Sequence, residues 1–358
     1  MSKSSQYMEW AKTRSQAKYN LALSGVIGYP LAQLPVTISD LEINGANSYG
    51  YQPLLDALAT KFNVESACVV HAAGTSMANH LAMATVLEHG DEVLVEHPAY
   101  DPLLEVPRYL CAKIKRFRRR FEEGFRLDVQ EIERNLSSQT RLIILSNFHN
   151  PSGVLTDNET LKAVGELARS VGAFVLVDEV YLEVMFEKAP PSSIHLGKEF
   201  IVTSSLTKAY GLSGLRCGWI LADVELAKRM RRLNDIFGAV SPFPSDYLSV
   251  VALENLDKIS TQAKKILEPN RVLLNEFLDS RKDLQVVRSE FATTSFPRLL
   301  NGTVENLCTT LREKYETSVV PGKYFEMPEH FRIGICCETN MLKIGLERLS
   351  AALDEIAQ

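Results

Sequence analysis

The sequence predicts an α/β protein built on a mostly parallel sheet that is covered by helices. Between residues 55 and 220, short apolar runs alternate with segments that have the apolar spacing of helices. This alternation is typical of parallel strands joined by crossover helices. Two runs, 142–146 and 174–177, are apolar almost throughout, as buried strands are. Polar residues follow several of these runs, at the sheet edge where α/β proteins place their ligands.

The predicted elements can be placed in chain order. Helices are expected near 54–62, 77–87, 101–110, 157–171 and 223–237, and strands at 92–95, 142–146, 174–177 and 200–203. After a break at 238–244, helices resume at 245 and a long helix covers 256–278. The remaining chain is expected to form strands at 284–287, 293–299 and 331–336 and helices at 304–315 and 341–357.

A basic segment at 113–120 has its own interpretation. It holds six basic residues interleaved with Ile114 and Phe117. This alternation predicts a half-exposed edge strand with Phe117 facing inward, and it does not favour an RNA-binding patch.

Composition limits the classes of protein that fit. With 358 residues, 46% of them hydrophobic, the chain is long enough to bury a full core and is expected to form two domains. A formal charge of −5 does not indicate a protein whose surface as a whole binds nucleic acid. The six cysteines show no metal-binding spacing, so we expect no metal, reduced thiols and a cytoplasmic protein. No apolar run predicts a signal peptide or a membrane span.

Lys208 is the residue that points most directly to chemistry. It follows the predicted strand 200–203 and two serines, and it precedes a glycine-rich stretch that contains Arg216. A lone lysine in such a turn is ordinarily a solvated surface cation. Together with the hydroxyl groups and the arginine, however, it suits an amine that forms an imine with an aldehyde while its neighbours hold an anion such as phosphate.

Three other motifs lie at the ends of strands or the starts of helices. Asp178 ends an apolar strand, and Tyr181 follows three residues later. Asn150 begins an Asn-Pro-Ser-Gly turn after another apolar run, and Thr75 and Ser76 stand before a predicted helix, where free N–H groups bind anions. Each motif alone has an ordinary explanation as a helix cap or a turn. All of them in this order are hard to explain in that way.

With these motifs, and with Phe331-Arg332-Ile333-Gly334 near the end, the chain resembles a fold-type I pyridoxal-phosphate (PLP) enzyme of the class I/II aminotransferase family. The resemblance extends roughly from Asn20 to the C-terminal helix. It implies the PLP-dependent transferase fold type I, with a seven-stranded, mostly parallel sheet in a large domain of residues 43–265. Residues 1–42 and 266–358 are expected to form a smaller α+β domain.

The resemblance also implies that Lys208, Asp178 and Tyr181 are catalytic and that Arg332 binds the substrate. Lys208 matches the lysine that holds PLP as an internal aldimine and then moves the proton from the substrate Cα. Asp178 matches the acid that keeps the ring nitrogen protonated. Arg332 matches the arginine that grips the substrate α-carboxylate as a fork.

The other implied contacts surround the same cofactor. Tyr181 and Asn150 are expected to hydrogen-bond the phenolic oxygen. The remaining cofactor contacts are Thr75, Ser76, Ser205 and Arg216 on the phosphate and Tyr100 stacked on the ring. Asn150 and Tyr29 are expected to contact the substrate as well.

The resemblance implies a homodimer, and one position departs from the family pattern. The family has a tyrosine five residues before a glycine ahead of the first large-domain helix, and this tyrosine reaches the partner subunit's phosphate. If Gly50 is that glycine, the tyrosine position is occupied by Gly45. Tyr49 is the candidate to replace it.

Three functions remain open from the sequence. The first is an aminotransferase that moves an amino group between an α-amino acid and a 2-oxo acid by a ping-pong mechanism. The second is a PLP-dependent lyase, cyclase or synthase that uses the same cofactor site. The third is a PLP-bound sensor domain of a transcription regulator, which requires a DNA-binding module for which there is no room before residue 20. The sequence does not indicate which amino acid is the substrate.

Overall fold

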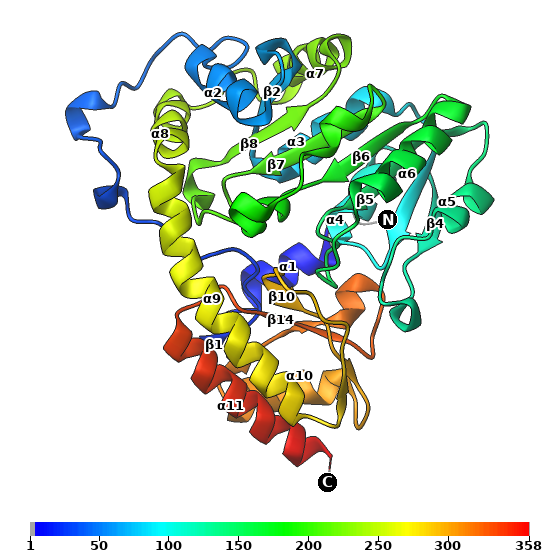
Figure 1. Cartoon of the computed structure of the whole chain (residues 1–358), viewed down its shortest axis with the longest axis vertical. Coiled ribbons are helices and arrows are strands. Elements are labelled where there is room, and N and C mark those ends of the chain that lie inside the picture. Colours follow the sequence, from blue (N-terminus) through cyan, green and yellow to red (C-terminus); the bar gives the residue numbers. More distant parts are fainter. Residues whose placement is uncertain (1–3, 358) are drawn as a thin grey trace.

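The computed structural model describes residues 4–357 and confirms the predicted α/β fold (Figure 1). The central sheet has seven strands in the order β2-β8-β7-β6-β5-β3-β4. Only β8 runs antiparallel to its neighbours. The strands are β2 Val69–Ala73, β3 Glu92–His97, β4 Lys113–Arg118, β5 Thr140–Ser146, β6 Phe174–Asp178, β7 Phe200–Ser205 and β8 Cys217–Leu221.

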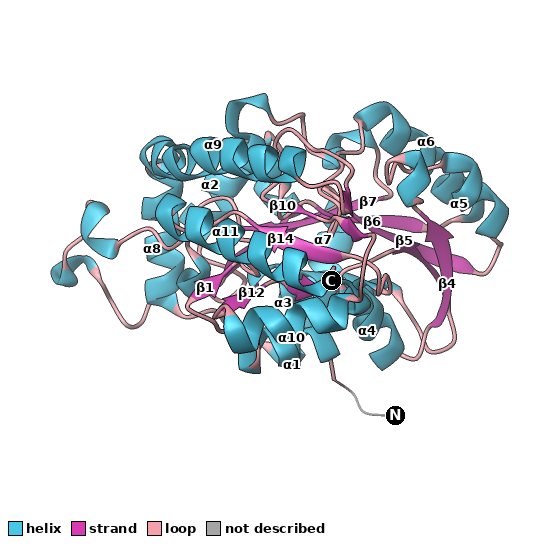
Figure 2. Ribbon diagram, turned by 90° about the horizontal axis from the view of Figure 1, so that it is seen from below, coloured by secondary structure: helices cyan, strands magenta, loops and turns pink. Residues whose placement is uncertain are grey.

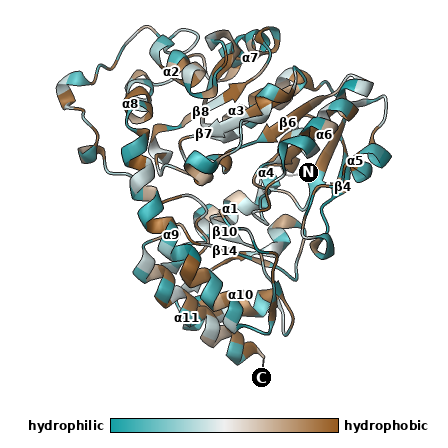
Figure 3. Ribbon diagram, viewed as in Figure 1, coloured by the Kyte–Doolittle hydropathy of each residue, from teal (hydrophilic) through white to brown (hydrophobic). Residues whose placement is uncertain are grey.

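Helices cover both faces of this sheet (Figure 2). Successive residues of a strand point to opposite faces. In β3, Val93 and Val95 belong to the apolar cluster beneath α3 (Gly74–Val86) and α4 (Asp101–Tyr109), whereas Leu94 belongs to the cluster beneath α6 (Asn158–Val171). Both faces therefore need apolar residues, which explains the uninterrupted apolar runs, and Figure 3 shows the strands as mostly hydrophobic.

The helices around the sheet lie close to their predicted positions, except that α5 was not predicted. They are α2 Gln52–Phe62, α3 Gly74–Val86, α4 Asp101–Tyr109, α5 Val129–Asn135, α6 Asn158–Val171 and α7 Val224–Phe237. Helix α6 shows why the boundaries were readable: the Asp157 side chain accepts from the backbone N–H of Thr160, and Gly172 ends the helix at φ 73°.

Strand β4 is the basic segment, and it lies at the edge of the sheet. Phe117 is fully buried, while Lys113 and Arg118 are exposed. The prediction of an edge strand with Phe117 inward is therefore confirmed.

The C-terminal part packs below the sheet in Figure 1, and a long helix leads into it. Helix α8 (Phe243–Glu254) packs against α2 beside the sheet, and the helices of the C-terminal part are α9 Leu256–Ser280, α10 Val304–Lys314 and α11 Thr339–Ile356. Its strands are β9 Leu284–Gln285, β10 Thr294–Ser295, β11 Arg298–Leu299, β12 Thr317–Ser318, β13 Val320–Pro321 and β14 Phe331–Gly334. The predicted strand at 293–299 is two short strands, because Pro297 between them has no N–H to donate.

The N-terminal segment joins this part. Helix α1 (Gln6–Thr13) is followed by β1 (Tyr19–Asn20), which pairs in parallel with β12. Leu21 belongs to the same apolar cluster as α9, α10 and α11. The exact division of the chain into domains at residues 43 and 266 stays a prediction.

Candidate active site

The candidate site lies where three parallel strands end together. Ser146 at the end of β5 is paired with Asp178 at the end of β6, and Asp178 is paired with Thr203 in β7. The turns that follow these strands carry Asn150 and Lys208. The register of the sheet therefore brings together residues that are far apart in the sequence.

Asp178 is a buried carboxylate, 4% exposed, without an ion-pair partner among residues 4–357. Its oxygens accept from Asn79 Nδ2 at 2.9 Å and from the N–H of Val180 at 3.1 Å. Thr203 Oγ1 donates to Asn79 Oδ1 at 2.6 Å and thereby fixes the Asn79 amide. Burial raises the pKa of Asp178 to about 6, against the lowering effect of these hydrogen bonds. A cationic ring nitrogen is the kind of group that this carboxylate suits.

Lys208 and Tyr181 meet at a serine. The Lys208 Nζ donates to Ser24 Oγ at 3.1 Å, and the Tyr181 hydroxyl donates to the same oxygen at 2.8 Å. The lysine amine lies 5.6 Å from the centre of the Tyr181 ring. Lys208 is therefore a partly buried amine and not a solvated surface cation.

Arg332 is fully buried and faces the same region. Its Nη1 donates to Asn150 Oδ1 at 2.8 Å, and its Nη2 donates to the Tyr7 hydroxyl at 3.0 Å. Its Nε is buried without a hydrogen-bond partner among the described residues. A buried guanidinium with an unused N–H and no acidic partner is suited to bind a carboxylate.

The start of α3 forms a close-packed corner with Arg216. Gly74 has φ 78°, and a Cβ added there would lie 2.3 Å from Arg216 Nη2. A Cβ on Gly218 would lie 2.3 Å from the Gly74 carbonyl carbon. Arg216 donates only to main-chain carbonyls in the described chain, and the buried Thr75 Oγ1 has no hydrogen-bond partner there. An unpartnered hydroxyl and a nearby arginine at a helix start are suited to bind a phosphate.

The remaining predicted site residues are placed as follows. Ser205 is buried next to Gly218 in the sheet, and its Oγ accepts from the N–H of Thr207. Ser76 is exposed in the first turn of α3. The Tyr100 ring meets Tyr7 edge-on at 5.5 Å, and burial raises the pKa of Tyr100 well above its ordinary value.

Two predicted tyrosines lie outside these contacts. Tyr29 is half-buried at the edge of the cluster that contains Leu206 and Leu212, and within residues 4–357 its hydroxyl has no hydrogen-bond partner. Tyr49 is 52% exposed, and its hydroxyl donates to Asp235 at 3.4 Å. At the position expected to hold a tyrosine, a Cβ on Gly45 would lie 2.0 Å from the Phe243 ring, so a side chain here would have to displace that ring.

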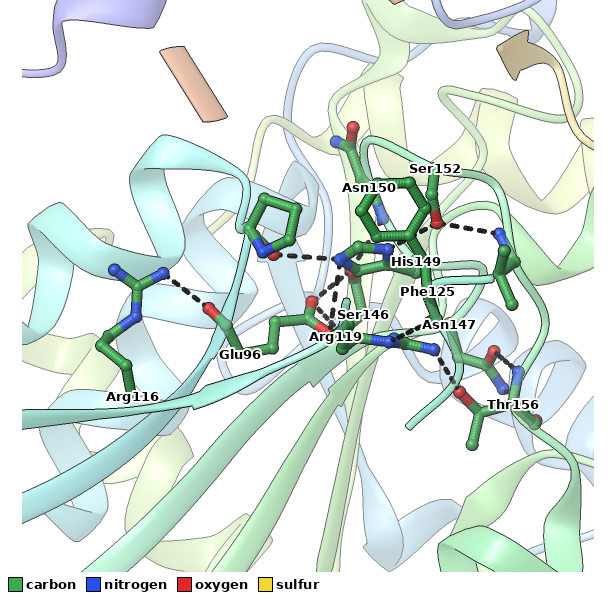
Figure 4. A network of polar contacts seen from close by, with 12 residues as sticks. Glu96, Arg116, Arg119, Phe125, Ser146, Asn147, His149, Asn150, Ser152 and Thr156 are labelled. Carbon is green, nitrogen blue, oxygen red and sulfur yellow. Dashed lines mark hydrogen bonds and ion pairs between the residues drawn. The ribbon is translucent and has the colours of Figure 1, made fainter. Parts of the chain in front are cut away.

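A buried polar network supports the turn that carries Asn150 (Figure 4). Glu96 and Arg119 form a fully buried ion pair at 3.0 Å. Glu96 also accepts from the N–H of Ser146 at 2.7 Å and from its hydroxyl at 2.6 Å. Ser146 Oγ in turn accepts from the N–H of Asn150 at 3.0 Å. The ion pair is therefore connected to Asn150 through a single serine.

His149 completes this network as a neutral group. Its Nε2 lies 2.9 Å from the Pro98 carbonyl, and its Nδ1 lies 2.6 Å from Ser152 Oγ. Because a carbonyl can only accept, Nε2 carries the proton and Nδ1 accepts from Ser152. Burial holds the pKa of His149 well below its ordinary value, which agrees with a neutral ring.

Comparison with known proteins assigns the chain to a family. The family model for aminotransferases of class I and II matches residues 38–349. The chain belongs to this family. The resemblance inferred from the motifs is thus confirmed, and this family member is an enzyme of the PLP-dependent class.

Three known proteins align with this chain over 84% or more of their own length. A PLP-dependent aminotransferase from Streptococcus suis superimposes with a TM-score of 0.92 at 26% identity, covering 98% of both chains. Capreomycidine synthase from Streptomyces vinaceus is 29% identical over 96% of this chain and 92% of its own. A probable aspartate/prephenate aminotransferase from Aquifex aeolicus is 27% identical over 87% and 84%.

The cofactor of the family is PLP, and the residues of this family member fit it. Three sets of residues match its three polar ends. The ring nitrogen is suited to the buried Asp178, the phosphate to the corner of Thr75 and Arg216, and the aldehyde to Lys208. Within residues 4–357, no group of three or more His, Cys, Asp or Glu side chains could hold a metal ion. Among residues 4–357, no helix is long and apolar enough to cross a membrane.

Sequence reasoning missed three residues of this region: Tyr7, Ser24 and Asn79. Tyr7 contacts Arg332 across 325 positions, and Ser24 contacts Lys208 across 184. Asn79 lies on α3, only one turn beyond the Gly-Thr-Ser motif. Asn79 could have been predicted, because it is a polar residue one turn into a helix that starts at a ligand site. No comparable local signal marks Tyr7 or Ser24.

Proposed function

We propose that this protein is a PLP-dependent aminotransferase that moves an amino group between an α-amino acid and a 2-oxo acid by a ping-pong mechanism. The observation that supports it most is a buried Arg332 hydrogen-bonded to Asn150, in the same region as the amine of Lys208. One group is suited to bind a carboxylate, and the other is suited to move a proton at the carbon next to it.

Each residue has a defined task in this proposal. PLP, when bound, supplies an electron sink that makes the α-hydrogen of an attached amino acid acidic. Arg332 binds and orients the α-carboxylate, and Lys208 takes the α-proton. Asp178 provides a buried negative charge for the ring nitrogen. Arg216 and Thr75 hold the phosphate, and Ser76, Ser205, Tyr100, Tyr181 and Asn150 are proposed to contact the cofactor as the family resemblance implies.

The direct test is a half-reaction without an acceptor. The purified protein loaded with PLP is mixed with each common amino acid in turn, and the cofactor absorbance and the released oxo acid are measured. An aminotransferase releases up to one 2-oxo acid per site and then stops, because the amino group stays on the enzyme. Continued turnover to another product would contradict transamination.

A synthase or cyclase acting on an amino acid is the second candidate. It is favoured by the alignment with capreomycidine synthase, which extends over 96% of this chain, whereas the aspartate/prephenate aminotransferase aligns over 87%. In the same half-reaction, this candidate predicts a cyclised or eliminated product with the starting absorbance restored after each turnover.

Lys208 is tested independently of turnover. The loaded protein is reduced with borohydride, and the mass of the peptide that contains Lys208 is measured. We expect a cofactor adduct on this lysine and none in Lys208→Ala. Lys198→Ala is the control, because the Lys198 side chain is 90% exposed and lies away from the site residues. An adduct on another lysine would refute the assignment.

Further proposals concern the cellular compartment of the enzyme, its oligomeric state and two tyrosines. All six cysteines are free, which supports a reducing compartment and hence the cytoplasm. A homodimer is supported by exposed apolar side chains in the segment that leads to Tyr49, including Ile38 at 90% and Ile43 at 80% exposed. Tyr49 is proposed to reach the partner subunit's phosphate, and Tyr29 is proposed to line the substrate pocket.

A further inference from the structure

The main chain of residues 22–25 passes along both cationic residues of the candidate site. The Ala22 carbonyl accepts from Arg332 Nη2 at 3.4 Å. Three residues later, a Cβ added to Gly25 would lie 3.1 Å from Lys208 Cδ. The N–H of Val26 then donates to the Lys208 carbonyl at 2.9 Å. This short segment therefore forms a wall that borders both the proposed carboxylate site and the proposed base.

Ser24 is the only residue of this wall with a polar side chain, and its hydroxyl faces the lysine. It is 6% exposed, and its oxygen accepts from Lys208 at 3.1 Å and from Tyr181 at 2.8 Å. The Ser24 carbonyl accepts from Thr293 Oγ1 at 3.3 Å, which ties the serine to the C-terminal part of the chain. In the described chain, Ser24 is the hydrogen-bond partner of the Lys208 amine.

We propose that Ser24 is a positioning residue that holds the Lys208 amine in place for proton transfer at the substrate α-carbon. This inference rests on the proposed function. A lysine side chain has a flexible four-carbon stem and loses conformational entropy whenever its amine is fixed. A buried hydroxyl that accepts from the amine limits this freedom before the proton moves, and small displacements of a catalytic group reduce rates strongly.

The proton balance leaves Ser24 unchanged. The α-carbon–hydrogen bond of the substrate breaks, and the proton passes to the Lys208 nitrogen, which later gives it back. The Ser24 oxygen accepts an N–H of Lys208 before and after this transfer, so its own O–H bond is never broken. Ser24 therefore acts through Lys208 and not as an acid or base.

The experiment follows hydrogen exchange at the α-carbon, which aminotransferases and synthases of this class share as an early step. The PLP-loaded protein is incubated with a mixture of the common amino acids in D2O, and loss of the α-hydrogen signals is followed by NMR. Ser24→Ala is expected to slow the exchange roughly tenfold, because the amine is no longer held. Ser24→Thr keeps the hydroxyl and is expected to retain most of the rate.

Two readouts other than activity accompany this measurement. Borohydride reduction is expected to give the Lys208 adduct in full with Ser24→Ala. In the cofactor-free protein, acetic anhydride is expected to acetylate Lys208 several-fold faster in this variant, since the amine has lost its hydrogen-bond acceptor. Ser15→Ala is the control: it removes a buried hydroxyl of the same N-terminal segment, which donates to the Ala11 carbonyl at 2.6 Å.

The possible outcomes separate this inference from the proposed function. Unchanged exchange in Ser24→Ala would overturn the positioning role while the Lys208 adduct upholds the cofactor site. Equal losses in Ser24→Ala and Ser24→Thr would attribute the effect to packing and would also overturn it. Absence of the adduct in the unmodified protein would refute the proposed function itself.

Discussion

At the scale of single residues, Asp178 illustrates how a candidate site differs from an ordinary core. A carboxylate that is 4% exposed and has no cationic partner among residues 4–357 is unfavourable for the folded protein. Its pKa is raised by burial to about 6, compared with 3.8 for a free side chain. This difference of about two pKa units corresponds to roughly 3 kcal/mol of lost stability when the group is ionised.

Asp178→Asn is therefore expected to stabilise the protein when no cofactor is bound. A group whose pKa is raised in the folded state favours folding at low pH, and this contribution is lost as pH rises through about 6. The gain from the neutral amide should thus be largest above pH 7 and should vanish below about pH 4. Thermal unfolding of both cofactor-free proteins across this pH range measures it. The variant should also lose most activity, and a variant that is both less stable and fully active would contradict the assigned role.

Tyr7 is the second residue whose effect can be predicted. Burial raises its pKa, but the charges of Arg332 and Lys208 and the hydrogen bond from Arg332 together outweigh burial, so that the net pKa is below the ordinary value. This agrees with a hydroxyl that accepts from Arg332 Nη2 at 3.0 Å. Loss of the acceptor leaves that N–H with only the Ala22 carbonyl at 3.4 Å.

Tyr7→Phe is expected to raise KM for the amino acid about fivefold with little change in kcat, as expected for a hydrogen bond to a charged group that orients Arg332. Steady-state kinetics with the donor found in the half-reaction measures both constants. Tyr324→Phe is the matched control, because its ring packs 6.1 Å from Tyr7 and its hydroxyl is not bonded to Arg332. A lower KM in Tyr7→Phe would show instead that Tyr7 competes with the substrate.

At the scale of elements, the sequence predicted those whose local pattern and tertiary surroundings agree. Helix α6 has a cap at each end, and the strands β5 and β6 are apolar because helices cover both faces. Strands β2 and β8 were missed. They pair with each other in antiparallel register. β2 runs directly into a glycine-containing motif that had been interpreted as part of the ligand site, and β8 begins within another.

The same reasoning explains which site residues were readable. Lys208, Asp178 and Asn150 stand in local motifs at strand ends, whereas Tyr7 and Ser24 reach the site from an N-terminal segment through long-range packing. The buried pair of Glu96 and Arg119 was also missed, since Arg119 looked like one more surface cation in a basic edge strand.

This buried pair leads to a prediction about the elements that it joins. Arg119→Met leaves Glu96 as an uncompensated buried charge and is expected to lower the free energy of unfolding by about 3–5 kcal/mol. Glu96→Gln combined with Arg119→Met removes both charges and keeps an acceptor for Ser146, so that most of this loss should be recovered. Urea unfolding of the single and double variants measures the difference. Additive losses would show that the two residues contribute independently.

At the scale of the whole molecule, the segment before α2 exposes apolar side chains that the rest of the described chain does not cover. It extends away from the rest of the chain, at the left of Figure 1, and carries Ile38 and Ile43 at 90% and 80% exposed. Ile236 at the end of α7 is 76% exposed as well. A cavity of about 210 Å³ is lined by Tyr49 near the end of this segment and by Ala73 and Arg216 at the proposed phosphate site.

Ile38→Asp combined with Ile43→Asp is therefore expected to convert a homodimer into monomers. Each exposed isoleucine contributes roughly 2 kcal/mol when it is buried against a partner subunit, and an aspartate in its place carries a charge that resists burial. Light scattering coupled to size-exclusion chromatography is expected to give twice the chain mass for the unmodified protein and the chain mass for the variant.

Leu300→Asp is the matched control for this change, because it introduces the same charge at an apolar residue, 46% exposed, in the C-terminal part of the chain. It is expected to leave the dimer intact. Since Tyr49 is proposed to reach the partner subunit's phosphate, the monomeric variant should also bind PLP more weakly while its far-ultraviolet circular dichroism stays unchanged. A variant that is monomeric but retains full affinity for PLP would place the whole cofactor site within one chain and would remove Tyr49 from it.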